Sequence, residues 1–426
     1  MKRLSIIKVN GVTKIFGPQA QRSLTLLKQG WSRERLATEK QATVAVNQVS
    51  FSVEPGEIFV IMGLSGSGKS TLVRMLNRLI EPTDGDIWLK DRNISKLNES
   101  ELREVRRKTI GMVFQKFALF PHRTVLDNAA YGLEIQGMAK EERYRKAREA
   151  LGLVGLDGWE QKYPDELSGG MQQRVGLARA LANDPDVLLM DEAFSALDPL
   201  IRRDMQDELL ALQQKMHKTI IFITHDLDEA LRIGDRIALL KDGKLIQIGT
   251  PEQMLMDPAD EYVERFVEGV DLSKVLTAAH IMRRPETVSL DRGPRVALQL
   301  MRDIGISTLF VVGKDKSLQG VVTAEQASEA ARGGQSLQEV MFTDVPTVSP
   351  DVLLNDLFAL SGEAKLPIAV VQPDGKLMGA IVRGAVLGAL AGNVPNGTNG
   401  ADGTTGTDAA ATDTEGMVMS HATADR

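Results

Sequence analysis

The stretch Ile58-Phe59-Val60-Ile61-Met62-Gly63-Leu64-Ser65-Gly66-Ser67-Gly68-Lys69-Ser70-Thr71-Leu72 decides the fold. It begins with an apolar run of strand length, continues with the pattern G-x-x-x-x-G-K-[ST] and ends in a helical pattern. Glycines let the backbone wrap around phosphate oxygens with its N–H groups inward, and the helix that follows adds its positive N-terminal end. The order strand, loop, helix favours a phosphate-binding loop over a glycine-rich turn of no function.

The loop gives its own side chains distinct tasks. Lys69 is expected to reach the β- and γ-phosphates of ATP, and the Ser70 hydroxyl is expected to ligate Mg²⁺. The residues expected to bind ATP here are Gly63, Ser65, Gly66, Ser67, Gly68, Lys69, Ser70 and Thr71.

Length and composition limit the class of protein. A chain of 426 residues is too long for one ordinary core, so two or three domains are expected. A hydrophobic content of 43%, a charged content of 25% and a net charge of -6 are those of a soluble globular protein with no reason to bind nucleic acid. The absence of cysteine excludes disulfides and thiolate metal sites and fits a reducing compartment.

No membrane-crossing or targeting segment is expected from the sequence. The N-terminus lacks the long apolar core of a secretory signal, and no uncharged apolar stretch approaches about 18 residues. If the protein acts on a membrane, another chain must span it.

The first two thirds of the chain read as an α/β domain. Residues 187–190 and 219–224 are continuous apolar runs, which suit strands buried on both faces of a mostly parallel sheet. A helical pattern lies between them, from Ile201 to Met216, and this alternation argues an α/β core. Residues 18–42 are polar with apolar residues at mostly helical spacing, so an inserted helical segment is expected there.

An internal repeat follows in the C-terminal third. Residues 286–291 resemble residues 346–351, sixty positions on, and each copy continues into two short apolar runs. Two copies of one strand–turn–strand unit predict a tandem α+β domain over residues 276–392. Residues 393–426 are rich in Gly, Thr, Ala and Asp, which predicts a disordered acidic tail.

Two strand ends carry residues suited to phosphoryl chemistry. Asp191 and Glu192 close the apolar run 187–190; Asp191 can hold Mg²⁺ through water, and Glu192 can polarise an attacking water at the γ-phosphate. His225 follows the run 219–224, at the end of a strand where α/β sheets place ligands, so we expect it to contact the γ-phosphate. The alternatives are a solvated acidic strand end and an ordinary surface histidine.

Several motifs together resemble the ATPase subunits of ABC transporters, in order and in spacing, over residues 5–270. They are the loop at 63–70, Gln115, Leu167-Ser168-Gly169-Gly170-Met171-Gln172-Gln173, Asp191-Glu192, Ser195-Ala196-Leu197-Asp198 and His225. The resemblance implies a P-loop ABC ATPase domain over residues 1–270, with a helical subdomain at about residues 100–180.

The same resemblance implies a head-to-tail homodimer that binds ATP and Mg²⁺. Each ATP would lie between the phosphate loop of one protomer and Ser168, Gly169 and Gly170 of the other, at a helix N-terminus. It also implies that Asp198 contacts the nucleotide and that Gln115 joins Ser70 and Asp191 at the Mg²⁺.

Two further roles come from the same resemblance. Gln115 and His225 are expected to act with Glu192 in catalysis. An aromatic ring should stack on adenine just after the first strand. Phe16 is the matching position, and Trp31, inside the insertion, is the alternative.

A narrower resemblance points to the ATPases of glycine betaine/proline importers. It rests on residues 57–70, 76–83 and 190–202, on the helical insertion and on the position of the repeat, where that subfamily carries tandem CBS modules. It implies import of compatible solutes with an integral membrane permease and, indirectly, an external solute-binding protein. The chain is then expected at the cytoplasmic face of the inner (plasma) membrane, with residues 117–122 as the permease contact or, equally, as a small local core.

Three alternatives stay open at this point. The first is an importer ATPase for another small solute, such as an amino acid or a sugar. The second is a soluble ABC ATPase acting on nucleic acid or ribosomes, which the single signature and the negative charge disfavour. The third is a sensor of nucleotide or ionic strength that carries an ATPase.

Overall fold

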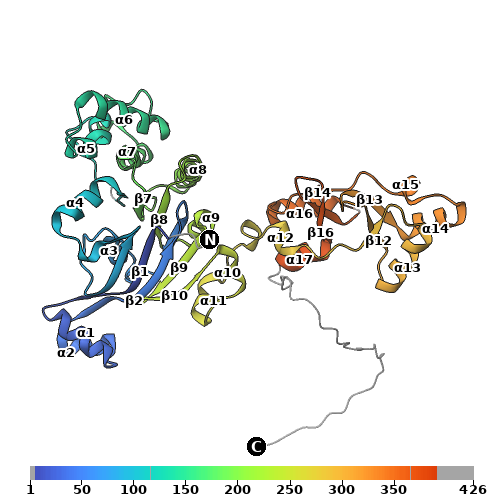
Figure 1. Ribbon diagram of the computed structural model, residues 1–426, viewed down its shortest axis with the longest axis horizontal. Helices are drawn as coiled ribbons and strands as arrows, with labels where there is room; N and C mark the ends of the chain where they lie inside the picture. Colours follow the sequence, from blue (N-terminus) through green and yellow to red (C-terminus); the bar gives the residue numbers. More distant parts are fainter. Residues whose placement is uncertain (1–4, 116, 365, 391–426) are drawn as a thin grey trace, which may run out of the picture. The chain divides into compact units, whose positions relative to one another are not determined.

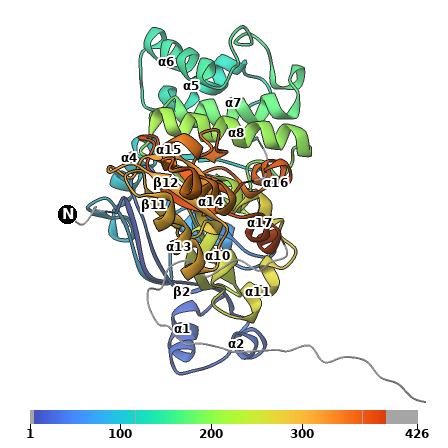
Figure 2. The same cartoon turned by 90° about the vertical axis from the view of Figure 1, so that its right-hand side faces the viewer.

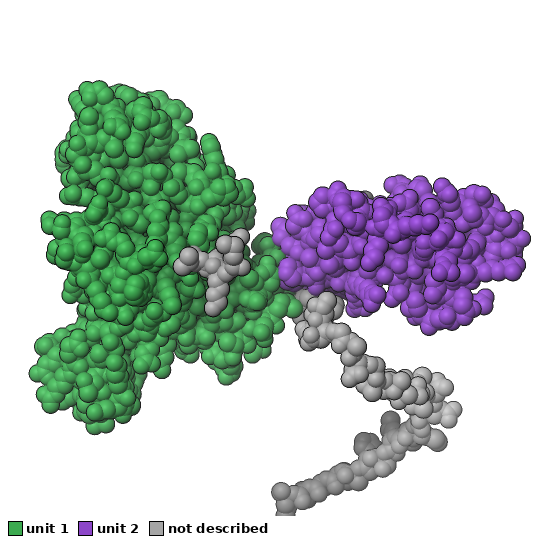
Figure 3. Space-filling view, viewed as in Figure 1, with its two compact units in different colours: residues 1–275 green, residues 276–426 purple. Residues whose placement is uncertain are grey.

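The computed structural model describes residues 5–115, 117–364 and 366–390. It divides into two compact units, residues 1–275 and 276–426, each with its own core (Figure 1; Figure 3). The tail expected to be disordered, residues 393–426, lies outside the described residues. No helix within the described ranges is both long enough and apolar enough to cross a bilayer.

A six-stranded sheet forms the centre of the first unit. Its order is β10 (Lys244–Gly249), β9 (Arg236–Lys241), β3 (Ile58–Met62), β8 (Thr219–Thr224), β7 (Val187–Asp191) and β6 (Ile110–Val113). All neighbours are parallel except β10, which pairs antiparallel with β9. The predicted α/β fold with a mostly parallel sheet is confirmed.

Both faces of this sheet are buried, which explains the continuous apolar runs. Successive side chains of a strand point to opposite faces. On β3, Val60 and Met62 join the core on the side of the helical group, while Phe59 and Ile61 join the core shared with a second sheet. A strand with a core on each side has no polar face, so its sequence shows no alternation.

The second sheet is antiparallel, and the sequence did not predict it as a separate layer. Its order is β2 (Thr43–Val53), β1 (Ile7–Phe16), β4 (Asp84–Leu89) and β5 (Arg92–Asn93). The connection from β1 to β2 carries α1 (Ala20–Lys28) and α2 (Arg33–Lys40), which lie at the expected insertion. Leu36 of α2 is buried against Ile15 and Val44, so the pair of helices has a small core of its own.

A group of helices lies at the opposite end of the unit from α1 and α2 in both views (Figure 1; Figure 2). It consists of α5 (Val125–Ile135), α6 (Lys140–Leu153) and α7 (Gly169–Leu181). Residues 110–113, inside the range expected to be a helical subdomain, instead form β6 of the central sheet. Gly111 there allows the close approach of Pro185 and Leu188.

The remaining helices of this unit connect or cover the strands. They are α3 (Lys69–Leu76), α4 (Glu99–Lys108), α8 (Pro199–Met216), α9 (Leu227–Ile233), α10 (Pro251–Met256) and α11 (Glu261–Val267), with the short 3-10 helices η1 (Ile94–Lys96), η2 (Pro164–Glu166) and η3 (Leu272–Lys274).

The second unit repeats one three-stranded sheet. The first copy is β11 (Thr287–Ser289), β12 (Thr308–Val312) and β13 (Leu318–Thr323); the second is β14 (Thr347–Val348), β15 (Ile368–Val371) and β16 (Leu377–Ile381). In each copy the first pair is parallel and the second antiparallel. The helices are α12 (Ala278–Ile281), α13 (Pro294–Ile304), α14 (Ala324–Gly333), α15 (Leu337–Val340), α16 (Leu354–Glu363) and α17 (Arg383–Leu390).

The two copies bury apolar surface against each other. Phe310 and Val321 of the first copy form one core cluster with Val345 and Ala369, and Ala369 belongs to the second copy. This shared core joins the two copies, as expected for repeat units that bury apolar surface against their neighbours.

Candidate nucleotide-binding site

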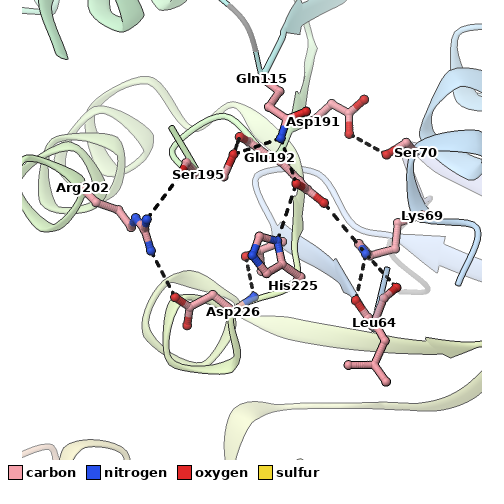
Figure 4. Close-up of polar contacts among 12 residues, drawn as sticks. Leu64, Lys69, Ser70, Gln115, Asp191, Glu192, Ser195, Arg202, His225 and Asp226 are labelled. Carbon is pink, nitrogen blue, oxygen red and sulfur yellow. Dashed lines mark hydrogen bonds and ion pairs between the residues drawn. The ribbon is translucent and has the colours of Figure 1, made fainter. Parts of the chain in front are cut away.

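The carboxyl ends of four parallel strands meet at one edge of the central sheet. Register places Met62 opposite Thr224, Asp191 opposite Ile223 and Val113 opposite Met190. The residues that follow these strand ends therefore come together: the loop at 63–68, Gln115, Glu192 and His225 (Figure 4). Ligands of open α/β sheets bind at this edge.

The phosphate loop is shaped by close backbone approaches. Gly68 has a φ of 99°, and a Cβ built there would lie 2.3 Å from the carbonyl oxygen of Ala45, so only glycine fits. Gly68 is also the N-cap of α3, which leaves the first N–H groups of that helix facing the loop. The buried Ser67 Oγ has no hydrogen-bond partner among the described residues, and a phosphate oxygen would satisfy it.

Lys69 turns back into the loop. Its Nζ donates to the carbonyl oxygens of Gly63 at 2.8 Å and Leu64 at 3.1 Å, and lies 3.9 Å from Oε1 of Glu192. Burial lowers the pKa of Lys69, while the charges of Glu192 and Asp191 act in the opposite direction. A bound phosphate would add negative charge beside this ammonium and stabilise its protonated form.

Ser70 and Asp191 offer oxygen ligands to Mg²⁺. The Ser70 Oγ donates to Oδ1 of the nearly buried Asp191 at 3.0 Å, and Arg74 lies 3.5 Å from Oδ2. Mg²⁺ usually takes one or two protein oxygens and fills its octahedron with phosphate and water, so this pair fits the ion. Gln115 is not part of the pair: its Nε2 donates to Glu192 at 3.2 Å and to Ser195 at 3.3 Å.

Glu192 stands in a left-handed backbone conformation at the centre of the group. Its φ is 46°, which costs an L-residue on the order of 1–2 kcal/mol. The Ser195 backbone N–H and Oγ both donate to the Glu192 carbonyl and fix this turn. The His225 Nδ1 lies 3.5 Å from Oε2, so Glu192 is contacted from three sides by Lys69, Gln115 and His225 (Figure 4).

Four of the expected nucleotide ligands lie on other elements. Ser168 is the N-cap of α7, where its Oγ accepts from the Met171 N–H at 3.3 Å, and Gly169 and Gly170 form the first turn of that helix. Asp198 caps α8 by accepting from the N–H groups of Leu200 and Ile201. Within the described residues, no hydrogen bond or ion pair joins these four to residues 63–71 of the same chain.

The two aromatic candidates differ in exposure. Phe16 ends β1 with 42% of its surface exposed, and Lys14 Nζ lies 5.0 Å from the centre of its ring. Trp31 packs in the small core of the insertion, and the guanidinium of Arg35 lies 3.7 Å from its ring centre. A cation lies over each ring, but Phe16 is exposed whereas Trp31 is partly buried.

The segment 117–122 is tied to α7 by a residue that the sequence did not single out. Arg179 donates to the carbonyl oxygens of Ala118 at 2.6 Å and Phe117 at 3.2 Å, and burial lowers its pKa. A cavity of about 250 Å³ beside it is lined in part by Leu79, Phe114 and Tyr131. Phe117 and Leu119 are partly buried against the main core, so the segment is both packed and adjacent to a surface hollow.

Models of two families match the chain. The ABC transporter family matches residues 46–195, which include the phosphate loop, Ser168 and Glu192. The CBS domain family matches residues 278–333, which is the first copy of the repeat.

Known relatives match most of the chain. The glycine betaine transport ATP-binding protein OpuAA of Bacillus subtilis is 62% identical over 91% of this chain and 93% of its own length. The glycine betaine/carnitine transport ATP-binding protein GbuA of Listeria monocytogenes is 59% identical over 92% of this chain and 99% of its own. Among solved structures, cbiO1 of Clostridium perfringens, part of an ABC transporter complex, matches with a TM-score of 0.50 and 26% identity over 62% of this chain and 94% of its own.

Proposed function

This chain belongs to the ATP-binding proteins of ABC transporters, and we propose that two copies of it hydrolyse ATP to power import of glycine betaine or a related compatible solute through a separate membrane permease. ATP hydrolysis is the activity of this family, and it follows for this chain from its membership. The solute comes from the names of the two relatives, which this chain matches over more than nine tenths of its own length.

One observation carries the proposal. The strand ends bring the phosphate loop, Asp191, Glu192 and His225 into one group, while Ser168, Gly169 and Gly170 stand on α7 with no polar contact to that loop within the described part of the chain. The second set of phosphate donors then comes from α7 of another copy, at a helix N-terminus that favours anions. Asp198 is proposed to reach the nucleotide across the same interface.

The residues of the group divide the chemistry among them. The loop amides and Lys69 bind the β- and γ-phosphates, and Phe16 stacks on adenine. Glu192 accepts a hydrogen bond from the attacking water and takes its proton, as a bond forms from the water oxygen to the γ-phosphorus and the bond to the β–γ bridging oxygen breaks. His225 contacts the γ-phosphate, and Gln115 orients Glu192 and the water.

The metal is part of this proposal. Mg²⁺, held by Ser70 and Asp191 and approached by Gln115, would neutralise phosphate charge when bound. The products are ADP and phosphate.

The transport partners are proposed from the same family membership. The permease contact is assigned to residues 117–122 and the hollow beside Arg179, at the cytoplasmic face of the membrane. An external binding protein would deliver the solute to the permease and never touch this chain.

The test is to co-express the chain with its permease, reconstitute the purified complex in liposomes and measure uptake of radiolabelled glycine betaine, with and without internal ATP. We expect ATP-dependent uptake that excess carnitine or proline reduces more than excess sugar does. Uptake of a sugar or of an unrelated amino acid in place of glycine betaine would overturn the solute. Failure to co-purify with any permease, together with an ATPase rate that nucleic acid stimulates, would overturn the transport function.

A further inference from the structure

Several polar contacts join α8 to α9 and its N-cap, and two of them start from one face of α8. Arg202 and Gln206 lie four residues apart and so share that face. Arg202 donates to Asp226 at 3.3 Å, and Gln206 donates to the buried Glu229 at 3.0 Å. Both acceptors belong to the segment that follows His225.

Arg202 has a second set of partners before α8 begins. Its Nη2 donates to the carbonyl oxygen of Leu197 at 3.2 Å. It also donates to that of Ser195 at 3.4 Å (Figure 4). One guanidinium therefore contacts the loop 195–198 with one nitrogen and Asp226 with the other. Its planar fork makes this possible, because a lysine ammonium is a single point and cannot reach the two sites in a fixed geometry.

Both partners of the Arg202 guanidinium, the loop 195–198 and Asp226, are linked to residues proposed to act on ATP. On one side, the Ser195 Oγ and N–H hold the Glu192 carbonyl and so fix the left-handed turn of the catalytic carboxylate. On the other side, Asp226 follows His225, and its own N–H is held by the Thr224 Oγ1 at 2.9 Å. Asp226 uses its second oxygen to cap α9 by accepting from the Glu229 N–H.

We propose that Arg202 is a positioning residue that makes the loop 195–198 and the His225 turn move as one body. The inference rests on the proposed function, in which loop 195–198 faces the second copy through Asp198. Closure of the two copies on ATP would then set His225 against the γ-phosphate in the same step as it sets Glu192. The Arg202 side chain itself touches neither ATP nor the reacting atoms.

The experiment is a double-mutant cycle on the reconstituted complex, with Arg202→Gln, Asp226→Asn and the double variant. Asp226→Asn keeps a side-chain oxygen for the cap of α9 but loses the charge that Arg202 binds. We expect Arg202→Gln to lower kcat by about 10- to 100-fold, since small misplacements of catalytic groups cost that much. ATP affinity of the isolated chain should stay the same, because the phosphate loop is untouched. Adding Asp226→Asn to Arg202→Gln should cause little further loss.

Controls separate positioning from folding. Arg203→Gln, on the exposed neighbour in the same turn, should keep the wild-type kcat. Arg202→Lys should fold with a wild-type Tm and still lose most of the rate. A wild-type kcat in Arg202→Gln, losses that multiply in the double variant, or a rate loss that follows Tm alone would each overturn the coupling. A wild-type chain that hydrolyses no ATP would instead overturn the proposed function with it.

Discussion

Glu192, the proposed general base, is held by its neighbours at both its side chain and its backbone. Its side chain is contacted by Lys69, Gln115 and His225, and its backbone is held in a left-handed turn by Ser195. A strained conformation that the surroundings enforce is common where a group must point in one direction. Asp191, which ends the strand, and Glu192, which stands in this turn, contact different partners, and this fits the two different tasks proposed for them.

Replacement of Glu192 by glutamine should abolish turnover and keep ATP binding. Glutamine has the same shape but cannot take the proton of the attacking water, and general-base catalysis is typically worth about 10²- to 10⁴-fold. The rate is followed by phosphate release and the binding by nucleotide fluorescence. Glu99→Gln, on the exposed start of α4, is the control with unchanged turnover. A Glu192→Gln variant that keeps more than about a tenth of the wild-type rate would remove Glu192 from this role.

Much of this site could be predicted from residue order alone. Parallel strands end at one edge, so Asp191, Glu192 and His225 had to meet the phosphate loop once their strands were identified. The left-handed φ of Glu192 could not be predicted, because nothing in a glutamate favours it and the turn depends on Ser195. The proposed role of Arg202 could not be predicted either, since its partners lie on two other segments of the chain.

At the scale of elements, buried polar contacts hold the helices around the site in position. Glu229 of α9 is 6% exposed, and burial is the main reason that its pKa is raised above 4.5. Hydrogen bonds from Thr224 and Gln206 oppose this effect, as does the charge of Arg202. The folded chain thus holds the Glu229 proton more tightly than the unfolded chain does.

Glu229→Gln should therefore change how stability depends on pH. A group whose pKa is higher in the folded chain than in the unfolded chain stabilises the fold, and the whole of this contribution is present at a pH below the unfolded-state pKa. The contribution is lost as the pH rises through the folded-state pKa. Glutamine has no such loss, so the Tm of Glu229→Gln should rise relative to wild type as the pH increases above about 4.5, the ordinary pKa of a glutamate. Asp228→Asn, on the exposed side of the same helix, is the matched control for removing one carboxylate from α9. A constant difference for Glu229→Gln would show that burial does not control this carboxyl.

The elements themselves were predictable where their pattern was local. The buried strands and α8 show clear apolar runs and a helical period. The antiparallel layer was not predicted because β1 pairs with β2 and with β4 over long sequence distances, and such pairing leaves no local signature. The short strand β6 was not predicted either. Its four residues include a glycine and have little strand propensity of their own, so they form a strand because they pair with β7.

At the scale of the whole molecule, the second unit suggests a gate on transport. One version is electrostatic. A charged module held at an anionic membrane is released by salt, because the Debye length falls from ~10 Å at 0.1 M to ~3 Å at 1 M. The other version is a nucleotide bound between the two copies of the repeat, near Thr287, Thr347 and Asp351. Both place regulation in residues 276–426.

Deletion of residues 276–426 should make solute uptake independent of internal salt. The first unit contains complete cores of its own, so it should fold without the second. Uptake is measured in vesicles at several internal salt concentrations and again at fixed salt with added nucleotide. A chain that ends at Gly392 is the matched control, since it removes only the tail, residues 393–426. An unchanged salt response after the full deletion would place the sensor elsewhere, and a nucleotide response lost only in the deletion would favour the ligand version.

The central claim is that ATP is bound and hydrolysed between two copies of this chain. The most direct measurement mixes Lys69→Ala protomers with Ser168→Arg protomers, each in a Glu192→Gln background that retains bound ATP. One mixed pair has both defects on the same site and leaves the other site intact. The account predicts ATP-dependent dimers with one nucleotide per pair in the mixture and none in either variant alone, by light scattering and nucleotide counting. A mixture that forms no more ATP-bound dimer than the separate variants would contradict the shared site.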